Sequence, residues 1–310
     1  MRIVVTGGAG FIGSNFIHHI LKKYPKYKII NIDNLTYAGN LHNLKDIERN
    51  KNYKFVKADI CDRKQIDKVI KGCDWIVHFA AESHVDRSIE SADIFTLTNV
   101  LGTQVLLDAA VRHKIKKFIH ISTDEVYGSR KKGFFKETDI LNPSSPYAAS
   151  KAASDLMVMA YRTTYGLPII ITRSSNNFGP RQYPEKVIPL FITRLMKNKK
   201  VPLYAKGENL RDWIFVEDNC CAVDLVAHKG KVGEIYNICA KNHLSNIQLT
   251  KKILKRMNKP TTMIKNVKDR LGHDFRYAVS NAKLCKLGFK PKYSLDKALD
   301  LTVEWYAEKL

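Results

Sequence analysis

The chain has 310 residues, 45% of them hydrophobic and 26% charged, which excludes a disordered, collagen-like or disulfide-rich small protein and, at about 150 residues per domain, predicts two domains. Lys and Arg outnumber Asp and Glu by 52 to 30, giving a formal net charge of +22. The cations occur in short groups along the whole chain, without interleaved aromatic residues or zinc-ligand spacing, so we expect a lysine-rich surface and no nucleic-acid partner.

Short β-branched runs alternate with longer helical patterns through the first half of the chain. Strands are predicted at residues 2–6, 28–33, 53–57, 75–79, 117–122 and 168–173. The runs Ile3-Val4-Val5 and Ile169-Ile170-Ile171 are apolar throughout, which is typical of strands covered by helices on both faces. The pattern predicts an α/β fold with a Rossmann-type, doubly wound parallel sheet.

The pattern becomes irregular after Arg173, because four prolines interrupt it: Pro180, Pro184, Pro189 and Pro202. A further strand is predicted at residues 235–239 and a helix at residues 247–257. We therefore expect a smaller C-terminal substrate-binding domain after the sheet.

A glycine-rich turn, Thr6-Gly7-Gly8-Ala9-Gly10-Phe11-Ile12-Gly13, joins the first predicted strand to a helical pattern. Glycines let the backbone approach a pyrophosphate, whose charge then lies against the free N–H groups of the helix N-terminus. Asp33 ends the second strand 20 residues after Gly13, where a carboxylate accepts hydrogen bonds from both ribose hydroxyls and repels a 2′-phosphate. The pattern predicts NAD, rather than NADP, as the cofactor.

Further cofactor contacts are expected at later strand ends, because ligands of open parallel sheets lie at the carboxyl edge. Asp59 and Ile60 follow the third predicted strand, and Ala80 and Ala81 follow the fourth.

Tyr147 and Lys151 lie four residues apart in a helical stretch, so they share one helix face. Thr123 follows the fifth predicted strand, and its hydroxyl can reach the same cleft. A tyrosine acting as base at neutral pH needs its pKa to fall by about 3 units from ~10, and the Lys151 ammonium and a positively charged nicotinamide ring can supply that shift. The pattern predicts a redox site with Tyr147 as its base.

Asp124 and Glu125 stand next to Thr123. Hydride transfer alone needs no such pair of carboxylates. Elimination of water next to a ketone needs one group to take a C–H proton and another to protonate the departing hydroxyl. The pair therefore favours a dehydration.

With these motifs the sequence resembles the dTDP-glucose 4,6-dehydratases, extended short-chain dehydrogenases/reductases of the NAD-dependent epimerase/dehydratase family that act on nucleotide sugars. The resemblance covers nearly the whole chain. Its motifs are residues 6–13, 33–40, 80–89, 122–128, 147–151, 175–180, 184–186, 211–213 and 272–274.

The resemblance implies a mechanism for five residues. Tyr147, helped by Thr123 and Lys151, takes the proton of the sugar 4-hydroxyl while hydride passes from C4 to NAD. Glu125 then removes the C5 proton while Asp124 protonates the departing C6 hydroxyl. Hydride returns to C6, and Glu125 delivers a proton to C5. The product is the nucleotide-linked 4-keto-6-deoxyglucose, and no net redox change occurs.

The resemblance also implies binding residues. Cofactor contacts are expected at Gly7, Gly10, Phe11, Ile12, Gly13, Asp33, Leu35, Thr36, Gly39, Asp59, Ile60, Ala80, Ala81, Thr98, Tyr147 and Lys151. Nucleotide-sugar contacts are expected at Ser83, Thr123, Asn176, Lys186, Pro202, Tyr204, Arg211, Asn246, Arg270 and His273. Departures from the family pattern at Arg181, Ala205, Lys206 and Leu271 leave the base open, thymine or uracil.

The domains and the assembly follow from the same resemblance. We assign residues 1–175 to the NAD-binding domain, with a return segment at 211–241, and residues 176–310 to the nucleotide-sugar-binding domain. Family members are commonly dimers through two helices per subunit, so we expect a homodimer in which residues 91–112 and 146–165 form the interface.

Two other functions would use part of the same residues. A nucleotide-sugar 4-epimerase would share the fold, the cofactor, Tyr147 and Lys151, but would not need Asp124 and Glu125. A protein that merely holds a dinucleotide would typically have lost one of these four side chains, and all are present.

The six cysteines form no C-x-x-C pair and no ligand spacing with the ten histidines, so we expect free thiols, a reducing compartment and no metal site. Met1 leads directly into a predicted strand, and no apolar stretch near the ~18 residues of a membrane span is evident. We expect a cytoplasmic protein without a membrane partner.

Overall fold

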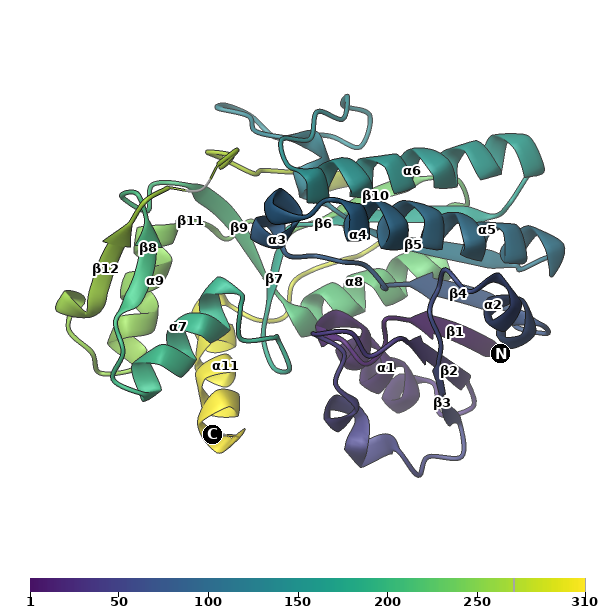
Figure 1. The fold of residues 1–310 in the computed structure, drawn as a ribbon, viewed down its shortest axis with the longest axis horizontal. Coiled ribbons are helices and arrows are strands. Elements are labelled where there is room, and N and C mark those ends of the chain that lie inside the picture. Colours follow the sequence, from purple (N-terminus) through teal and green to yellow (C-terminus); the bar gives the residue numbers. More distant parts are fainter. Residues whose placement is uncertain (270, 310) are drawn as a thin grey trace.

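The computed structural model describes residues 1–269 and 271–309. A seven-stranded parallel sheet of order β10-β6-β5-β4-β1-β2-β3 forms its centre (Figure 1). The predicted doubly wound parallel sheet is confirmed, and each predicted strand end lies within one residue of the observed one. The strands are β1 (Arg2–Thr6), β2 (Lys28–Asp33), β3 (Tyr53–Lys57), β4 (Trp75–His78), β5 (Lys117–Thr123), β6 (Ile169–Ser174) and β10 (Ile235–Ile238).

Helices cover both faces of this sheet, because successive side chains of a strand point to opposite sides. Ile3 and Val5 of β1 join an apolar cluster with α1 (Phe11–Lys23) and α8 (Val216–Lys229). Val4 joins a second cluster on the other face, built with α2 (Arg63–Ile70), α5 (Gly102–Arg112) and α6 (Pro146–Tyr165). The uninterrupted apolar runs of the sequence follow from this double cover.

The remaining chain forms a smaller body beside the sheet, on the left in Figure 1. One sheet has the order β11-β9-β7, and β8 pairs in parallel with β12. Helices α7, α9 and α11 enclose a third apolar cluster there. The elements are β7 (Asn176–Phe178), α7 (Val187–Met196), β8 (Val201–Tyr204), β9 (Leu210–Phe215), β11 (His243–Ser245), α9 (Asn246–Arg256), η4 (Thr261–Met263), β12 (Ile264–Val267) and α11 (Leu295–Lys309). Helix α10 (Ala282–Lys286) instead packs on the large sheet, against β10.

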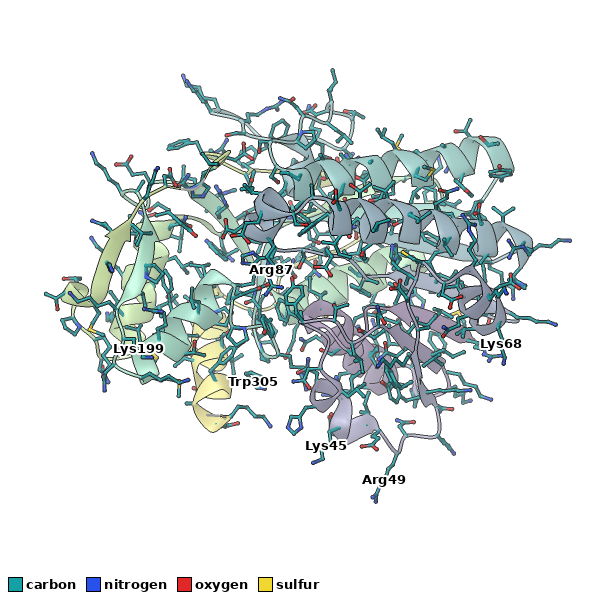
Figure 2. All side chains as sticks on the ribbon, viewed as in Figure 1. Lys45, Arg49, Lys68, Arg87, Lys199 and Trp305 are labelled. Carbon is teal, nitrogen blue, oxygen red and sulfur yellow. The ribbon has the colours of Figure 1, made fainter. Side chains whose placement is uncertain are left out.

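Short helical segments connect the strands: η1 (Leu41–Ile47), α3 (Val85–Glu90), α4 (Asp93–Phe95), the π-helical η2 (Thr96–Leu101) and η3 (Asp124–Tyr127). Helix α8 and strand β10 return to the large sheet after the chain has visited the smaller body. The boundary at residue 175 stays a prediction. Lys45 in η1, Lys68 in α2 and Lys199 in the loop between α7 and β8 are exposed, in keeping with a basic surface spread over the molecule (Figure 2).

The expectation that no apolar stretch approaches the length of a membrane span is wrong. The continuous helical segment Asp93–Arg112 has 20 residues and is, by length and composition, long and apolar enough to cross a membrane. Half of its most apolar window is buried inside the protein, where the segment packs against α6, and core helices pass the same test. The segment is therefore weak support for a membrane span.

Candidate active site

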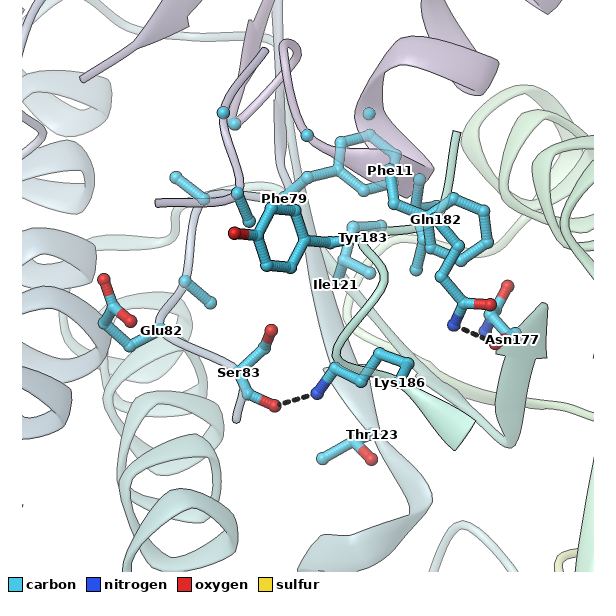
Figure 3. Close-up of a pocket in the computed structure, with 18 of the residues that line it drawn as sticks. Phe11, Phe79, Glu82, Ser83, Ile121, Thr123, Asn177, Gln182, Tyr183 and Lys186 are labelled. Carbon is cyan, nitrogen blue, oxygen red and sulfur yellow. Dashed lines mark hydrogen bonds between the residues drawn. The ribbon is translucent and has the colours of Figure 1, made fainter. Parts of the chain in front are cut away.

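A cavity of about 360 Å³ opens at the carboxyl edge of the parallel sheet. Residues from the ends of β1, β2, β4, β5 and β6 line it on one side, and residues 182–188 line it on the other. Figure 3 shows Phe11, Ile121, Gln182 and Tyr183 gathered around this space. The topology thus collects strand ends that are far apart in sequence, as expected for a doubly wound sheet.

The glycine turn forms the floor of the cavity at the N-terminus of α1. Gly7 has a φ of 68°, and a Cβ there would lie 2.6 Å from the Ala80 backbone nitrogen. A Cβ on Gly13 would lie 2.3 Å from the Gly7 carbonyl oxygen. Only glycine fits at these two positions, and the bare backbone leaves room for a pyrophosphate against the helix N-terminus.

Asp33 is held in place by the turn itself. Its Oδ2 accepts a hydrogen bond from the Ala9 N–H at 2.9 Å, and its Oδ1 accepts one from the Leu35 N–H at 2.8 Å. Burial raises the pKa of Asp33, although both backbone donors oppose that rise. The carboxylate lines the cavity. The two backbone bonds leave further lone pairs, which can accept hydrogen bonds from the two hydroxyls of a ribose.

The cavity brings together all but one of the residues assigned to the cofactor from the sequence. Leu35 does not line it; its φ of 57° and its backbone bond to Asp33 shape the turn instead. The residues that do line it are Gly7, Gly10, Phe11, Ile12, Gly13, Asp33, Thr36, Gly39, Asp59, Ile60, Ala80, Ala81, Thr98, Tyr147 and Lys151.

Helix α6 delivers Tyr147 and Lys151 to the same cavity. Ser145 caps the helix by accepting a hydrogen bond from the Ala148 N–H, and Pro146 occupies its first turn. Both side chains line the cavity. Lys151 is 3% exposed and donates from Nζ to the Ile121 carbonyl oxygen at 2.8 Å.

The ionisation of this pair differs from the sequence-based expectation. Desolvation and the nearby Glu125 raise the pKa of Tyr147, and only the Thr123 hydroxyl lowers it. Burial lowers the pKa of Lys151 to about 8, opposed by Asp155. The protein's own groups therefore keep the phenol protonated, so a bound cation must supply the downward shift.

Thr123, Asp124 and Glu125 lie where β5 ends and η3 begins, and all three line the cavity. The Thr123 hydroxyl accepts a hydrogen bond from the Glu125 N–H at 3.2 Å and lies 3.5 Å from Asp124 Oδ1. The strand end thus fixes both carboxylates beside the tyrosine helix.

Asp124 is buried to 3% exposure, and within residues 1–269 and 271–309 its Oδ2 has no hydrogen-bond partner. Burial raises the pKa of this carboxyl well above its usual range, and the carboxylates of Glu125 and Asp212 add to the rise. A raised pKa means that Asp124 keeps its proton at a pH where an exposed aspartate has lost it. The arrangement can donate a proton near neutral pH.

Four of the residues assigned to the nucleotide sugar line the cavity: Ser83, Thr123, Asn176 and Lys186. Lys186 donates from Nζ to the Ser83 carbonyl oxygen at 2.6 Å across the opening (Figure 3). Arg87 and Glu185 approach to 3.4 Å between the same two segments. These contacts tie residues 185 and 186 to residues 83 and 87 at the cavity.

The other assigned residues lie outside the lining of this cavity. Tyr204 on β8 reaches Asp86 at 3.4 Å, and its ring lies 5.9 Å from that of His273. Arg211 is 5% exposed and donates to the carbonyl oxygens of residues 210, 274 and 275. Pro202 lies on β8 and Asn246 begins α9, whereas Arg270 lies outside the described residues.

One neighbour of the acid pair was missed in the sequence. The Tyr277 hydroxyl donates to Asp274 Oδ2 at 2.7 Å and lies 3.5 Å from Glu125 Oε2. No local motif marks this tyrosine, and only the Gly272-His273-Asp274 motif shortly before it pointed to this segment.

A dinucleotide fits the cavity, because the glycine turn admits a pyrophosphate and Asp33 faces the position of a ribose. Tyr147 and Lys151, one helical turn apart, then lie at the nicotinamide end of the dinucleotide. The protein is therefore a Rossmann-type dinucleotide enzyme of the short-chain dehydrogenase/reductase class.

Comparison with known proteins narrows this class. The family model described as GDP-mannose 4,6 dehydratase matches residues 4–302, and the chain belongs to this family. A dTDP-glucose 4,6-dehydratase of Streptomyces niveus is 49% identical over 313 residues, covering 99% of this chain and 93% of that protein.

Solved structures give the same result. DesIV, a dTDP-glucose 4,6-dehydratase from Streptomyces venezuelae crystallised with NAD and TYD bound, matches with a TM-score of 0.98 and 47% identity over 99% of this chain and 97% of that one. A UDP-glucose 4-epimerase from Thermotoga maritima matches with a TM-score of 0.93 and 31% identity over 100% and 99%. Both the TM-score and the sequence identity are higher for the dehydratase than for this epimerase.

Proposed function

We propose that this protein is an NAD-dependent nucleotide-sugar 4,6-dehydratase, a hydro-lyase that converts dTDP-glucose to the 4-keto-6-deoxyglucose derivative. The observation that carries the proposal is the buried Asp124 beside Glu125 in the cavity that also holds Tyr147. A 4-epimerase needs no second acid–base pair. The names of the similar dehydratases support the same choice.

The first half of the reaction uses Tyr147, Thr123 and Lys151. Bound NAD supplies a positively charged ring that takes up hydride and later gives it back. Tyr147 accepts the proton of the sugar 4-hydroxyl, and the Thr123 hydroxyl stabilises the phenolate. The Lys151 ammonium, anchored to the Ile121 carbonyl, adds positive charge near the phenol.

The second half uses the two acids. The ketone at C4 acidifies the C5 proton, which Glu125 removes. Protonated Asp124 donates to the C6 hydroxyl, so that water rather than hydroxide departs. When C6 receives hydride, Glu125 returns its proton to C5. Lys186 and Arg211 are proposed to hold the diphosphate.

The proposal is tested by mixing purified protein with dTDP-glucose and with UDP-glucose in separate tubes and following product mass. We expect the dTDP-sugar to lose the mass of one water without added cofactor, faster than the UDP-sugar. A product of unchanged mass and altered configuration at C4 would make the protein an epimerase.

Asp33 is expected to select and retain NAD. Asp33→Ala should weaken NAD binding about 10- to 100-fold, because hydrogen bonds to a charged group contribute about 1.5–3 kcal/mol. Calorimetric titration of cofactor-stripped protein measures this change, with the surface variant Asp139→Asn as control. Equal NAD affinity in Asp33→Ala and wild type, or wild-type dependence on NADP, would contradict the assignment.

We also propose a homodimer. The two helical segments expected to form its interface pack against each other and expose a shared set of apolar side chains. These are Ile94 (46% exposed), Leu97 (50%), Leu101 (37%), Leu156 (57%) and Met159 (41%). Exposed apolar surface on adjacent helices supports association with a second copy.

A charge in that surface should break the dimer. The double variant Leu97→Glu/Leu156→Glu is expected to sediment as a monomer, because an interface would bury unpaired carboxylates. Ile140→Glu, at an 87% exposed position outside these helices, is the control and should leave the dimer intact. A double variant that still sediments as the dimer, or a wild-type monomer, would refute this interface.

We place the protein in the cytoplasm. All six cysteines are free, and three of them are buried, which suits a reducing compartment.

A further inference from the structure

A polar network lies beneath the site, between the sheet and α6, and the proposed chemistry gives it no task. It consists of His120 on β5, Tyr127 in η3, Asp155 on α6 and Arg173 on β6, each no more than 2% exposed. Arg173 is the largest fully buried side chain among the described residues. A buried ion pair stabilises a fold little better than packed apolar side chains, so its presence points to another purpose.

Hydrogen bonds connect the network. Arg173 donates from Nε to Asp155 Oδ2 at 2.8 Å and from Nη1 to the Tyr127 hydroxyl at 2.8 Å. That hydroxyl donates onward to Asn237 Oδ1 at 2.9 Å. The other carboxylate oxygen, Asp155 Oδ1, lies 3.4 Å from His120 Nε2. One oxygen of Asp155 is thus fixed by the guanidinium and the other faces the interior.

The network reaches the site through Lys151. Tyr147, Lys151 and Asp155 follow one another at intervals of four residues on α6, so they form one stripe along this helix, which packs against β5 and β6. The Ile121 carbonyl that anchors Lys151 belongs to the residue after His120. Along α6, Lys151 therefore lies between the proposed base and the buried carboxylate.

Several ionisable groups surround Lys151, and most are neutral. Burial lowers the pKa of His78 on β4 well below its usual range and that of His120 to about 4. Tyr127 and Tyr147 have raised pKa values, and so does Asp124 in η3.

Among the charged groups of the other helices that contact α6, Asp108 pairs with Arg63 and accepts a hydrogen bond from Tyr161, Arg112 pairs with Asp67, and Arg87 pairs with Glu185. Helices α3 and α4 also carry Asp86, Glu90 and Asp93. Burial raises the pKa of Asp155, but His120, Arg173 and Lys151 outweigh it and hold the pKa low. Two cations, Lys151 and Arg173, therefore share this one ionised carboxylate.

We propose that Asp155 is a positioning residue that keeps the Lys151 side chain charged and oriented toward Tyr147, and that Arg173 limits its effect by holding one of its oxygens. This inference rests on the proposed function, because it acts through the task given to Lys151 there.

The sign of each substitution follows from charge. Without the Asp155 carboxylate the charged form of Lys151 is less stable, so its pKa falls. In Asp155→Asn the loss of kcat at alkaline pH should therefore occur about one pH unit lower than in the wild type. Removing the competing cation should move it upward in Arg173→Met. Arg173→Lys keeps the positive charge, so the alkaline loss of kcat should occur at the wild-type pH, since the shift depends on charge rather than on shape.

The test compares pH profiles of kcat for the holoenzymes, with lysine side-chain NMR of the same samples reporting the Lys151 titration. Signals are assigned with Lys151→Met, and Asp139→Asn is the control. If Asp155→Asn does not fold, the contrast between Arg173→Met and Arg173→Lys still decides. A downward shift of the alkaline limb in Asp155→Asn and an upward shift in Arg173→Met support the proposal. An alkaline limb at the same pH in every variant overturns it.

The same variants distinguish a failure of the proposed mechanism from a failure of the Asp155 inference alone. Lys151→Met with the wild-type rate would remove the proposed task of Lys151 and so the proposed mechanism. An inactive Lys151→Met together with unshifted Asp155 and Arg173 variants would overturn only this inference. A purely structural contribution of Asp155 would lower kcat at every pH without moving the limb.

Discussion

Asp124→Asn should convert the protein into one that oxidises its sugar and then stalls. The amide has nearly the same size as the carboxyl group, so the site keeps its shape while losing the proton that makes the C6 hydroxyl a leaving group. Elimination should slow by about 100-fold, within the range of general acid catalysis. The reduced cofactor should accumulate.

Rapid mixing with dTDP-glucose measures both events, the near-ultraviolet absorbance of reduced nicotinamide and the appearance of product. Asp139→Asn, a carboxylate paired with Arg130 at the surface, is the control and should behave as wild type. Dehydration at the wild-type rate without a build-up of reduced cofactor would show that Asp124 is not the acid.

Tyr147→Phe should block the reaction one step earlier. The ring of Tyr147 packs edge-on against Phe95 at 6.3 Å, and phenylalanine retains that contact, so the fold should be preserved. Without the hydroxyl the 4-hydroxyl proton has no acceptor, and turnover should fall by about 1000-fold. Neither reduced cofactor nor product should form, in contrast to Asp124→Asn. Normal oxidation in Tyr147→Phe would place the base elsewhere.

Much of the fold could be predicted because its signals are local. The runs Ile3–Val5 of β1 and Ile169–Ile171 of β6 are apolar because both faces of these strands are covered. The glycine turn, Asp33 and the Tyr147–Lys151 spacing each lie within a short stretch of sequence. These patterns need no knowledge of which segments meet.

The ionisation of the site could not be predicted, because it depends on burial and on distant partners. The sequence suggested that Lys151 lowers the pKa of Tyr147, but desolvation and Glu125 raise it. Tyr277 approaches Glu125, and Arg173 meets Asp155, only because the fold joins separate segments. The raised pKa of Asp124 comes first from burial, which sequence does not reveal, and the neighbouring Glu125 adds to it.

The central claim is an internal redox cycle in which hydride leaves C4 and returns to C6. It is tested most directly with dTDP-glucose carrying deuterium at C4 and with NMR of the product. We predict a product that has lost water and carries the deuterium in its C6 methyl group. Deuterium recovered at C4 of a sugar that has lost no water would contradict the claim and identify an epimerase.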